Sequence, residues 1–133
     1  MVGIESKAEP ICLAELSKQG FTVSKPFSDH CRYDLVIEKN GNMERAQVKI
    51  GRLKDGCIKF KTESEYANTN EYIRSSYTKE DIDCFVVYCP DNENIYKINV
   101  ENTPNTAMHL RINKPENGQQ KGINWAENFK LTT

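Results

Sequence analysis

One hairpin constrains the fold of this chain more than any other feature of its sequence. The dipeptide Asn40-Gly41 is flanked by two apolar runs, residues 33–37 and 46–50. Asn-Gly is the strongest short-range signal for a two-residue hairpin turn, because both turn positions need a positive φ. If this dipeptide forms the turn, Lys39 pairs with Asn42, and that pair sets the register of both strands.

This register brings three polar side chains together on one face of the hairpin. Asp34 lies directly opposite Gln47, and Lys49 lies diagonal to them. Directly opposite Cβ atoms are about 5 Å apart, and diagonal ones are roughly 7–8 Å apart. An acid, an amide and an ammonium group are therefore close enough to hold one metal ion and one phosphate. The other face is predicted to be a core face, formed by Tyr33, Leu35, Ile37, Ala46, Val48 and Ile50.

Length and composition indicate one globular domain. The chain has 133 residues, of which 38% are hydrophobic and 28% charged, and a chain of this length forms a single domain with a real core. No apolar run approaches the roughly 18 residues of a membrane span. The N-terminus shows no basic stretch followed by an apolar core, so we expect no signal peptide.

The cysteines do not indicate a metal site. The five cysteines are scattered, and none is part of a CxxC pair or of a CxxC–HxxxH spacing, which argues against zinc. Reduced, buried thiols in an intracellular protein, in the cytoplasm or nucleoid, are the simpler interpretation.

The overall charge is close to neutral, but one stretch is basic. The formal net charge is −1, whereas residues 49–61 contain five basic residues and one acid. A basic strip beside an acidic metal site is what an enzyme that cuts phosphodiesters needs, although a solvated strand face would look the same. The candidate DNA contacts in this strip are Arg52, Lys54, Lys59 and Lys61.

The first predicted element is a helix over residues 6–19. Ser6 and Glu9 fit a capping box, and Gly20 fits a C-terminal stop. Helical spacing places Glu9 on the core-facing stripe and Glu15 with the solvent-facing set. That stripe also contains Cys12, Leu13 and Leu16.

The remaining elements give the order α-β-β-β-(α)-β. Residues 62–81 are polar and predict a loop and a short helix, whereas residues 84–89 are continuously apolar and predict a buried strand. We also expect a polar loop at residues 113–122 and a terminal helix that includes Ile123, Ala126 and Phe129, with Trp125 partly inward. The other expected strands cover residues 21–24, 57–61 (as a third strand of the hairpin sheet), 95–100 (antiparallel to 84–89) and 107–112.

The hairpin resembles the active-site hairpin of the PD-(D/E)xK nucleases. In that superfamily an Asp begins one strand, and an acidic-x-Lys tripeptide occupies the next. This chain has Asp34 and then Gln47-Val48-Lys49, with Gln where an acid is usual, as in the subgroup that contains the cyanobacterial-type group I intron homing endonucleases. The resemblance extends from about Glu9 to about Phe129. It includes residues 20–26, 31–37, 46–49, 83–90 and 121–126.

The resemblance implies a fold and a metal site. The fold is a restriction-endonuclease-like α/β core, a mixed β-sheet flanked by helices in the order α-β-β-β-α-β. Asp34 would bind Mg²⁺, for which Mn²⁺ would substitute, together with the helix acid Glu9 and the backbone carbonyl of Val48. Gln47 offers a weaker neutral oxygen, or it orients water or phosphate through its amide. Lys49 is a compact point charge suited to the phosphate or to the nucleophilic water.

Simpler interpretations of these residues remain open. Asp34, Gln47 and Lys49 fit a solvated strand face by alternation alone, and Glu9 fits a plain capping residue. The polar segment would contact a DNA groove, or merely decorate a loop, through Asn68, Asn70, Arg74 and Tyr77. His30 and His109 fit surface residues better than catalysts, and Tyr33 and Trp125 fit the core better than a base-stacking platform.

The resulting hypothesis is a Mg²⁺-dependent endonuclease that hydrolyses double-stranded DNA at a specific site, as homing or restriction enzymes do. A small domain with one active site cuts one strand at a time, so double-strand cleavage implies a homo-oligomer, a dimer or a tetramer. One alternative is a structure-selective nuclease similar to Holliday junction resolvases. The other is a DNA-binding module that has lost catalysis, which the Gln at position 47 keeps open.

Overall fold

The computed structural model describes residues 5–28, 30–67, 72–112 and 122–131. A five-stranded mixed sheet has the order β1-β2-β3-β8-β9, a smaller sheet has the order β10-β5-β4, and β6 pairs with β7. Only β3 and β8 are parallel neighbours in the large sheet. The elements are α1 (Glu5–Lys18), β1 (Thr22–Ser24), β2 (Leu35–Lys39), β3 (Asn42–Ile50), β4 (Arg52–Lys54), β5 (Cys57–Lys61), β6 (Glu63–Ala67), β7 (Tyr72–Ser76), β8 (Cys84–Cys89), β9 (Asn94–Asn99), η1 (Val100–Asn102), β10 (Ala107–Arg111) and η2 (Ala126–Asn128).

The hairpin has the predicted register. Lys39 pairs with Asn42 and Leu35 pairs with Ala46, and both turn residues have a positive φ, 55° at Asn40 and 82° at Gly41. The pairing continues one residue before β2, because the backbone N–H of Asp34 donates a hydrogen bond to the carbonyl of Ala46 at 2.8 Å. The Asn-Gly turn therefore determines which hairpin residues share a face.

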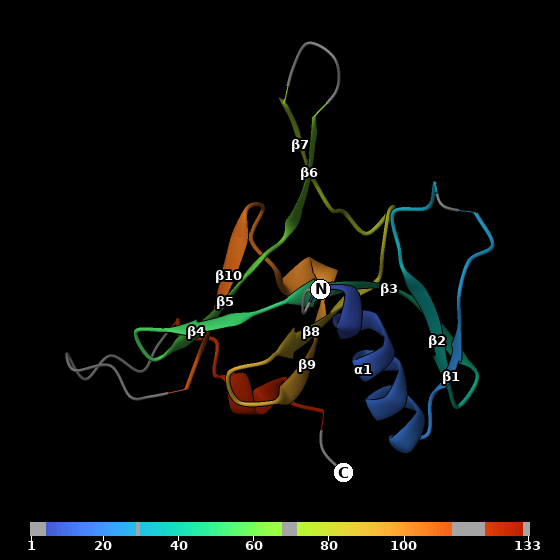
Figure 1. Ribbon diagram of the computed structural model, residues 1–133, viewed down its shortest axis with the longest axis horizontal. Coiled ribbons are helices and arrows are strands. Elements are labelled where there is room, and N and C mark those ends of the chain that lie inside the picture. The colour runs from blue at the N-terminus through green and yellow to red at the C-terminus, as the bar shows by residue number, and fades with distance from the viewer. Residues whose placement is uncertain (1–4, 29, 68–71, 113–121, 132–133) are drawn as a thin grey trace.

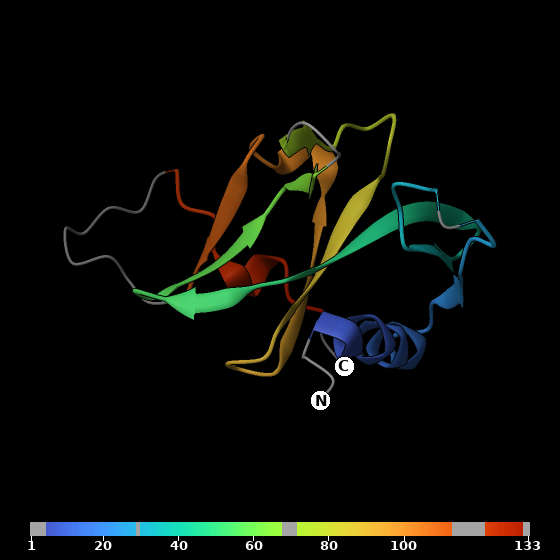
Figure 2. The same ribbon diagram turned by 45° about the horizontal axis from the view of Figure 1, so that its top comes forward.

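The large sheet separates two apolar cores, and β8 contributes alternate residues to both. On one side lies α1 (Figures 1 and 2). We call this side the helix-side core, formed by Ala8, Cys12, Leu16, Leu35, Ile37, Ala46, Cys84, Val86, Tyr88 and Ile95. The other side is the strand-side core, formed by Ile58, Phe60, Ile82, Phe85, Val87, Cys89, Tyr96, Ile98, Val100, Met108, Leu110 and Ala126.

The predicted core face of the hairpin is confirmed except at one residue. Val48 and Ile50 pack against the helix-side core with the buried hairpin residues, but Tyr33 packs against the strand-side core. Tyr33 precedes β2, so the strand alternation does not extend to it. On α1, Cys12 and Leu16 are fully buried as expected, whereas Leu13 is 38% exposed and does not belong to the core stripe.

Most other predicted elements are confirmed within a residue or two, and three are corrected. Residues 57–61 form a strand, but in the smaller sheet rather than in the hairpin sheet. Residues 62–81 contain the strand pair β6–β7 instead of a helix, and the terminal helix is only the short 3-10 turn η2. Trp125 is partly buried, and the polar loop predicted at 113–122 lies, up to residue 121, outside the described residues.

Gly51 connects β3 to β4 and so joins the two sheets. Its backbone N–H donates to the carbonyl of Tyr88 at 2.9 Å. A Cβ at this position would lie 2.6 Å from Cγ2 of Ile58 and 3.0 Å from Cγ1 of Val87. The long ribbon from β3 into β4 (Figure 2) therefore passes so close to the strand-side core that only a residue without a side chain fits.

Two further findings concern the cysteines and membrane insertion. All five cysteines are free thiols; Cys12, Cys84 and Cys89 are buried, whereas Cys31 and Cys57 are only partly buried. In the part of the chain that the structure describes, no helix is long and apolar enough to cross a bilayer.

Candidate active site

The carboxylate of Asp34 is held at the start of the hairpin. Its Oδ2 atom accepts a hydrogen bond from the backbone N–H of Val48 at 2.9 Å. Burial raises the pKa of Asp34, the Val48 hydrogen bond lowers it, the negative charge of Glu9 raises it, and the positive charges of Lys49 and Lys25 lower it, with a net rise. A partly buried carboxylate thus lies within electrostatic reach of one acid and two ammonium groups.

Glu9 is positioned by the first half of α1. Its Oε1 atom forms an ion pair with Nζ of Lys25 at 2.5 Å, and its side chain is 31% exposed. Its negative charge is one of the influences that raise the pKa of Asp34, after burial of that carboxyl. Glu15 instead accepts a hydrogen bond from the amide of Gln19 along the helix at 3.3 Å. Glu15 is partly buried like Glu9 and not solvent-facing as predicted, but Glu9 is the helix acid whose charge acts on Asp34.

Gln47 and Lys49 lie on the face of β3 opposite to α1. In the parallel pairing with β8 they align with Phe85 and Val87, both residues of the strand-side core. The ammonium group of Lys49 donates to the backbone carbonyl of Glu63, the first residue of β6, at 3.2 Å. Gln47 is partly buried.

Tyr77, proposed from sequence as a DNA contact, has a different environment from an exposed loop residue. Its ring is half-buried and lies 5.1 Å from Nζ of Lys49 and 4.2 Å from the guanidinium carbon of Arg32. The ring of Phe85 meets it edge-on at a centroid distance of 5.5 Å. Its role in DNA binding remains a prediction.

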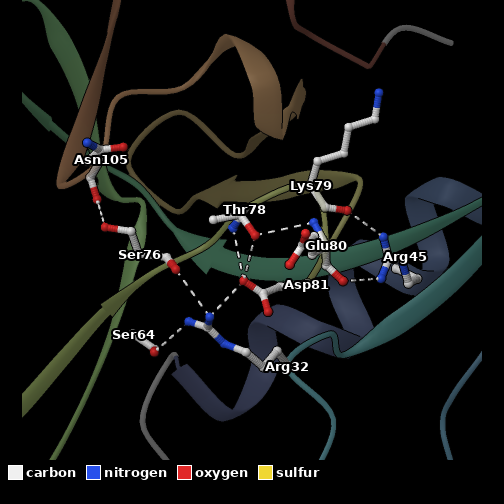
Figure 3. Close-up of polar contacts among 9 residues, drawn as sticks. All are labelled: Arg32, Arg45, Ser64, Ser76, Thr78, Lys79, Glu80, Asp81 and Asn105. Carbon is white, nitrogen blue, oxygen red and sulfur yellow. Dashed lines mark hydrogen bonds and ion pairs between the residues drawn. The ribbon is translucent and has the colours of Figure 1, made fainter.

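Arg32 is a site-adjacent residue that sequence reasoning missed. Its guanidinium donates to Asp81 Oδ2 at 2.8 Å, to the carbonyl of Ser76 at 3.1 Å and to Oγ of Ser64 at 3.0 Å (Figure 3). These acceptors come from the start of β6, the end of β7 and the segment before β8. The only available signal was its position two residues before Asp34, because no periodic pattern reveals these partners.

A second arginine fixes the connection into β8. Arg45 donates to the carbonyls of Lys79 at 2.8 Å and Glu80 at 2.7 Å (Figure 3). Its Nε also forms an ion pair with Asp83 at 3.2 Å. Partial burial raises the pKa of Asp83, but the side-chain and backbone hydrogen bonds from Arg45 lower it further, so that the net shift is downward.

The predicted basic strip lies on one face of the smaller sheet. Arg52 pairs with Lys59 and Lys54 pairs with Cys57, while Ile58 and Phe60 turn inward to the core. Pairing with β10 adds two basic residues that sequence reasoning did not include, because His109 faces Lys59 and Arg111 faces Cys57. The residues of this face are Arg52, Lys54, Cys57, Lys59, Lys61, Ala107, His109 and Arg111, and none is acidic. We call it the basic face.

The remaining DNA-contact candidates from the sequence are Asn68, Asn70 and Arg74. Asn68 and Asn70 lie outside the described residues, and the side chain of Arg74 on β7 lies outside them as well. Among the described residues, no group of three or more His, Cys, Asp or Glu side chains is arranged to hold a metal ion. The candidate metal ligands at this site are the carboxylates of Asp34 and Glu9 and the neutral oxygens of Gln47 and Val48.

Known proteins share the fold of this chain. A solved structure described as a bacterial homing endonuclease, I-Ssp6803I, superposes with a TM-score of 0.74 at 23% sequence identity, covering 94% of this chain and 84% of that chain. That likeness shows the same fold. No match was found among curated proteins. The sequence model of the PD-(D/E)XK endonuclease family matches residues 5–132, and because this match spans nearly the whole chain, the protein belongs to the PD-(D/E)XK endonuclease family.

Proposed function

We propose that the protein is a divalent-metal-dependent endonuclease that cuts double-stranded DNA at a specific site, as homing or restriction enzymes do. The observation that carries this proposal is the environment of Asp34. Its carboxylate is half-buried, bonded to the Val48 N–H, and within reach of the charges of Glu9, Lys49 and Lys25. An acid pair next to ammonium groups fits phosphodiester hydrolysis, which needs a metal site and a phosphate site side by side.

The residues present fit a magnesium ion. Burial and the charge of Glu9 both raise the pKa of Asp34, so a bound cation would relieve an electrostatic cost that the protein carries without it. Asp34 and Glu9 would hold Mg²⁺ or Mn²⁺, with the carbonyl of Val48 and the amide oxygen of Gln47 as neutral donors, all of the hard-oxygen type that these ions prefer. When bound, the ion would lower the pKa of a water and act as a Lewis acid.

The other residues have separate tasks. Lys49 would neutralise the scissile phosphate, since its ammonium is a compact donor held near Asp34. Gln47, on the same face of β3, would orient water or phosphate through its amide. The basic face would lie along the DNA backbone, because Lys54, Lys59, Lys61 and Arg111 add positive charge there beside Arg52, which pairs with Asp91 at 3.6 Å. Phosphate contacts dominate DNA affinity.

Two wider features belong to the same proposal. Cleavage of both strands by a domain with one active site requires at least two copies, so we propose a homo-oligomer, a dimer or a tetramer. The protein would act inside the cell, where its DNA substrate lies. The five free cysteines support this location, because thiols stay reduced there.

The first experiment is cleavage of a randomised duplex library with and without Mg²⁺, beside a four-way junction. Metal-dependent cutting at one recurrent duplex sequence is the expected result. Cutting confined to the junction would replace the proposal with a resolvase-like activity. Tight DNA binding without cutting in Mg²⁺ or Mn²⁺ would mean that Gln47 marks an inactive site.

Matched variants test the residue roles. Asp34→Asn should abolish cleavage and leave DNA affinity nearly unchanged, and Lys49→Ala should slow the chemical step by about 10²-fold or more, as loss of one electrostatic stabiliser does. Glu9→Gln is compared with Glu15→Gln, which changes the other partly buried acid of the same helix. Equal, small losses from the two glutamate variants would remove Glu9 from the metal site.

A further inference from the structure

The ring of Tyr77 lies at a junction between the hairpin and the β6–β7 strand pair. Lys49 contributes its ammonium from β3, and Arg32 contributes its guanidinium from the segment before β2, and both lie within about 6 Å of the ring centroid, which is the range of cation–π attraction. No sequence pattern predicts this arrangement. Tyr77 follows β7 directly along the chain.

The ring itself is held in place. Phe85 meets it at an interplanar angle of 87°, and the backbone N–H of Tyr77 donates to the carbonyl of Thr62 at 3.5 Å. Burial raises the pKa of the Tyr77 hydroxyl, a hydrogen bond with Ser64 and the charge of Arg32 lower it, and the charge of Asp34 raises it. The Tyr77 hydroxyl therefore has Ser64 and Arg32 as hydrogen-bond partners.

The base of the β6–β7 strand pair is also held by hydrogen bonds from Arg32 and Lys49. Arg32 bonds to Ser64 at the start of β6, to the carbonyl of Ser76 at the end of β7, and to Asp81 beyond it (Figure 3). The ammonium group of Lys49 donates a hydrogen bond to the backbone carbonyl of Glu63, a buried residue with 8% exposure. The base of the β6–β7 pair is thus joined to the two cations that contact the Tyr77 ring, while the pair itself projects away from the body of the protein (Figure 1).

We propose that Tyr77 is a positioning residue, whose ring face holds the ammonium of Lys49 beside Asp34 and couples it to the base of the β6–β7 strand pair. This inference rests on the proposed function, because it assigns Lys49 to the scissile phosphate. A lysine side chain has a flexible four-carbon stem and a single charge. Without a fixed aromatic face, its ammonium would retain the Glu63 carbonyl as a partner but would sample a wider region.

The kinetic test compares two substitutions at Tyr77, using the duplex recovered from the library. Tyr77→Leu removes the aromatic face and should lower kcat about tenfold, the effect of losing a partly desolvated cation–π contact. KM and the metal-free DNA affinity should change less than about twofold by the same reasoning. Tyr77→Phe keeps the face and should retain nearly the full kcat. Phe129→Leu is the matched control, since Phe129 packs against the same strand-side core without either cation.

Three kinetic results would overturn the proposal. If Tyr77→Phe loses as much kcat as Tyr77→Leu, the hydroxyl acts rather than the ring. If Tyr77→Leu weakens DNA binding at constant kcat, Tyr77 contacts DNA directly. If Phe129→Leu lowers kcat equally, the effect is general destabilisation of the core.

A second measurement does not depend on cleavage. The ring current of Tyr77 should displace the ε-methylene proton signals of Lys49 upfield, and Lys49→Arg assigns those signals by their loss. The displacement should disappear in Tyr77→Leu and persist in Tyr77→Phe. Its absence from the wild-type protein would refute the contact even in an active enzyme. Its presence in a protein that cuts nothing would leave the contact standing and refute the proposed function instead.

Discussion

Gly51→Ala is the most direct test of how the two sheets are joined. Gly51 does not have a positive φ, so alanine is compatible with its backbone, and the effect of the substitution is one of space. The new methyl group would lie 2.6 Å from Cγ2 of Ile58 and 3.0 Å from Cγ1 of Val87. An optimal carbon–carbon contact is about 3.5–4.0 Å, so these neighbours must move by up to about 1 Å.

The expected loss of stability follows from this overlap. Forcing a methyl group into a packed core costs about 1–3 kcal/mol. The lower conformational freedom of the unfolded alanine chain offsets about 0.5–1 kcal/mol of that cost. We therefore expect a net loss of about 1.5 kcal/mol in the free energy of unfolding, which corresponds to a fall in Tm of roughly 5 °C for a domain of this size.

Thermal and urea unfolding, followed by circular dichroism, measure this effect. The double variant Gly51→Ala/Ile58→Leu provides the control, because leucine lacks the branch methyl that alanine would meet. Its loss should be smaller than the sum of the two single losses, which marks two residues in direct contact. A Gly51→Ala protein as stable as the wild type, or strictly additive losses, would refute the steric account of this junction.

The remaining predictions concern Asp34, Asp83 and Arg32. Burial, and to a smaller extent the charge of Glu9, raise the pKa of Asp34, so the ionised carboxylate costs stability above its folded-state pKa. Asp34→Asn should therefore raise Tm at pH 7 while abolishing cleavage. An unchanged or lower Tm would contradict this. Asp83 has a lowered net pKa despite the opposing effect of burial. Its stabilisation is present at neutral pH and is lost as pH falls from about 4 through the folded-state pKa. Asp83→Asn should therefore lower Tm at pH 7 and much less at pH 2–3, and an equal loss at both values would exclude the ionic contribution. Arg32→Lys keeps the charge but not the forked donors, so limited proteolysis should cut near the base of β6–β7 faster than in the wild-type protein, and unchanged cutting would contradict the role of Arg32.

The hairpin could be predicted because its determinants are local. Asn40 and Gly41 specify the turn, the turn specifies the register, and the register places Asp34 near Lys49 without reference to the rest of the chain. The helical position of Glu9 was predictable for the same reason, because the 3.6-residue period places it one turn before Cys12. The buried strand at residues 84–89 was evident from its continuous apolar composition, because both of its faces contact a core.

What sequence reasoning missed depends on contacts between distant segments. The sequence of the β6–β7 pair predicts a loop and a helix, because its residues are mostly polar and apolar residues do not alternate with polar ones along it. The prediction for residues 57–61 was wrong about the sheet. The chain passes from the large sheet to the smaller one at Gly51, and the need for glycine there comes from Ile58 and Val87, which are distant in sequence from each other. Arg32 had no sequence signature, since its partners lie 32 to 49 residues away along the chain.

The difference between local and distant contacts also orders the folding of this protein. The bond from Val48 to Asp34 joins residues 14 apart, whereas the bonds of Arg45 to Asp83 and of Arg32 to Asp81 join residues 38 and 49 apart. Contacts that close short loops form earlier and faster than those that close long ones. The hairpin that holds Asp34 can therefore form while the chain is still incomplete. The contacts of Arg32 with Asp81 and with the Tyr77 ring require that residues 77–81 have been synthesised. A newly made chain would then acquire catalytic competence only after synthesis has passed residue 81, well after the hairpin itself can form.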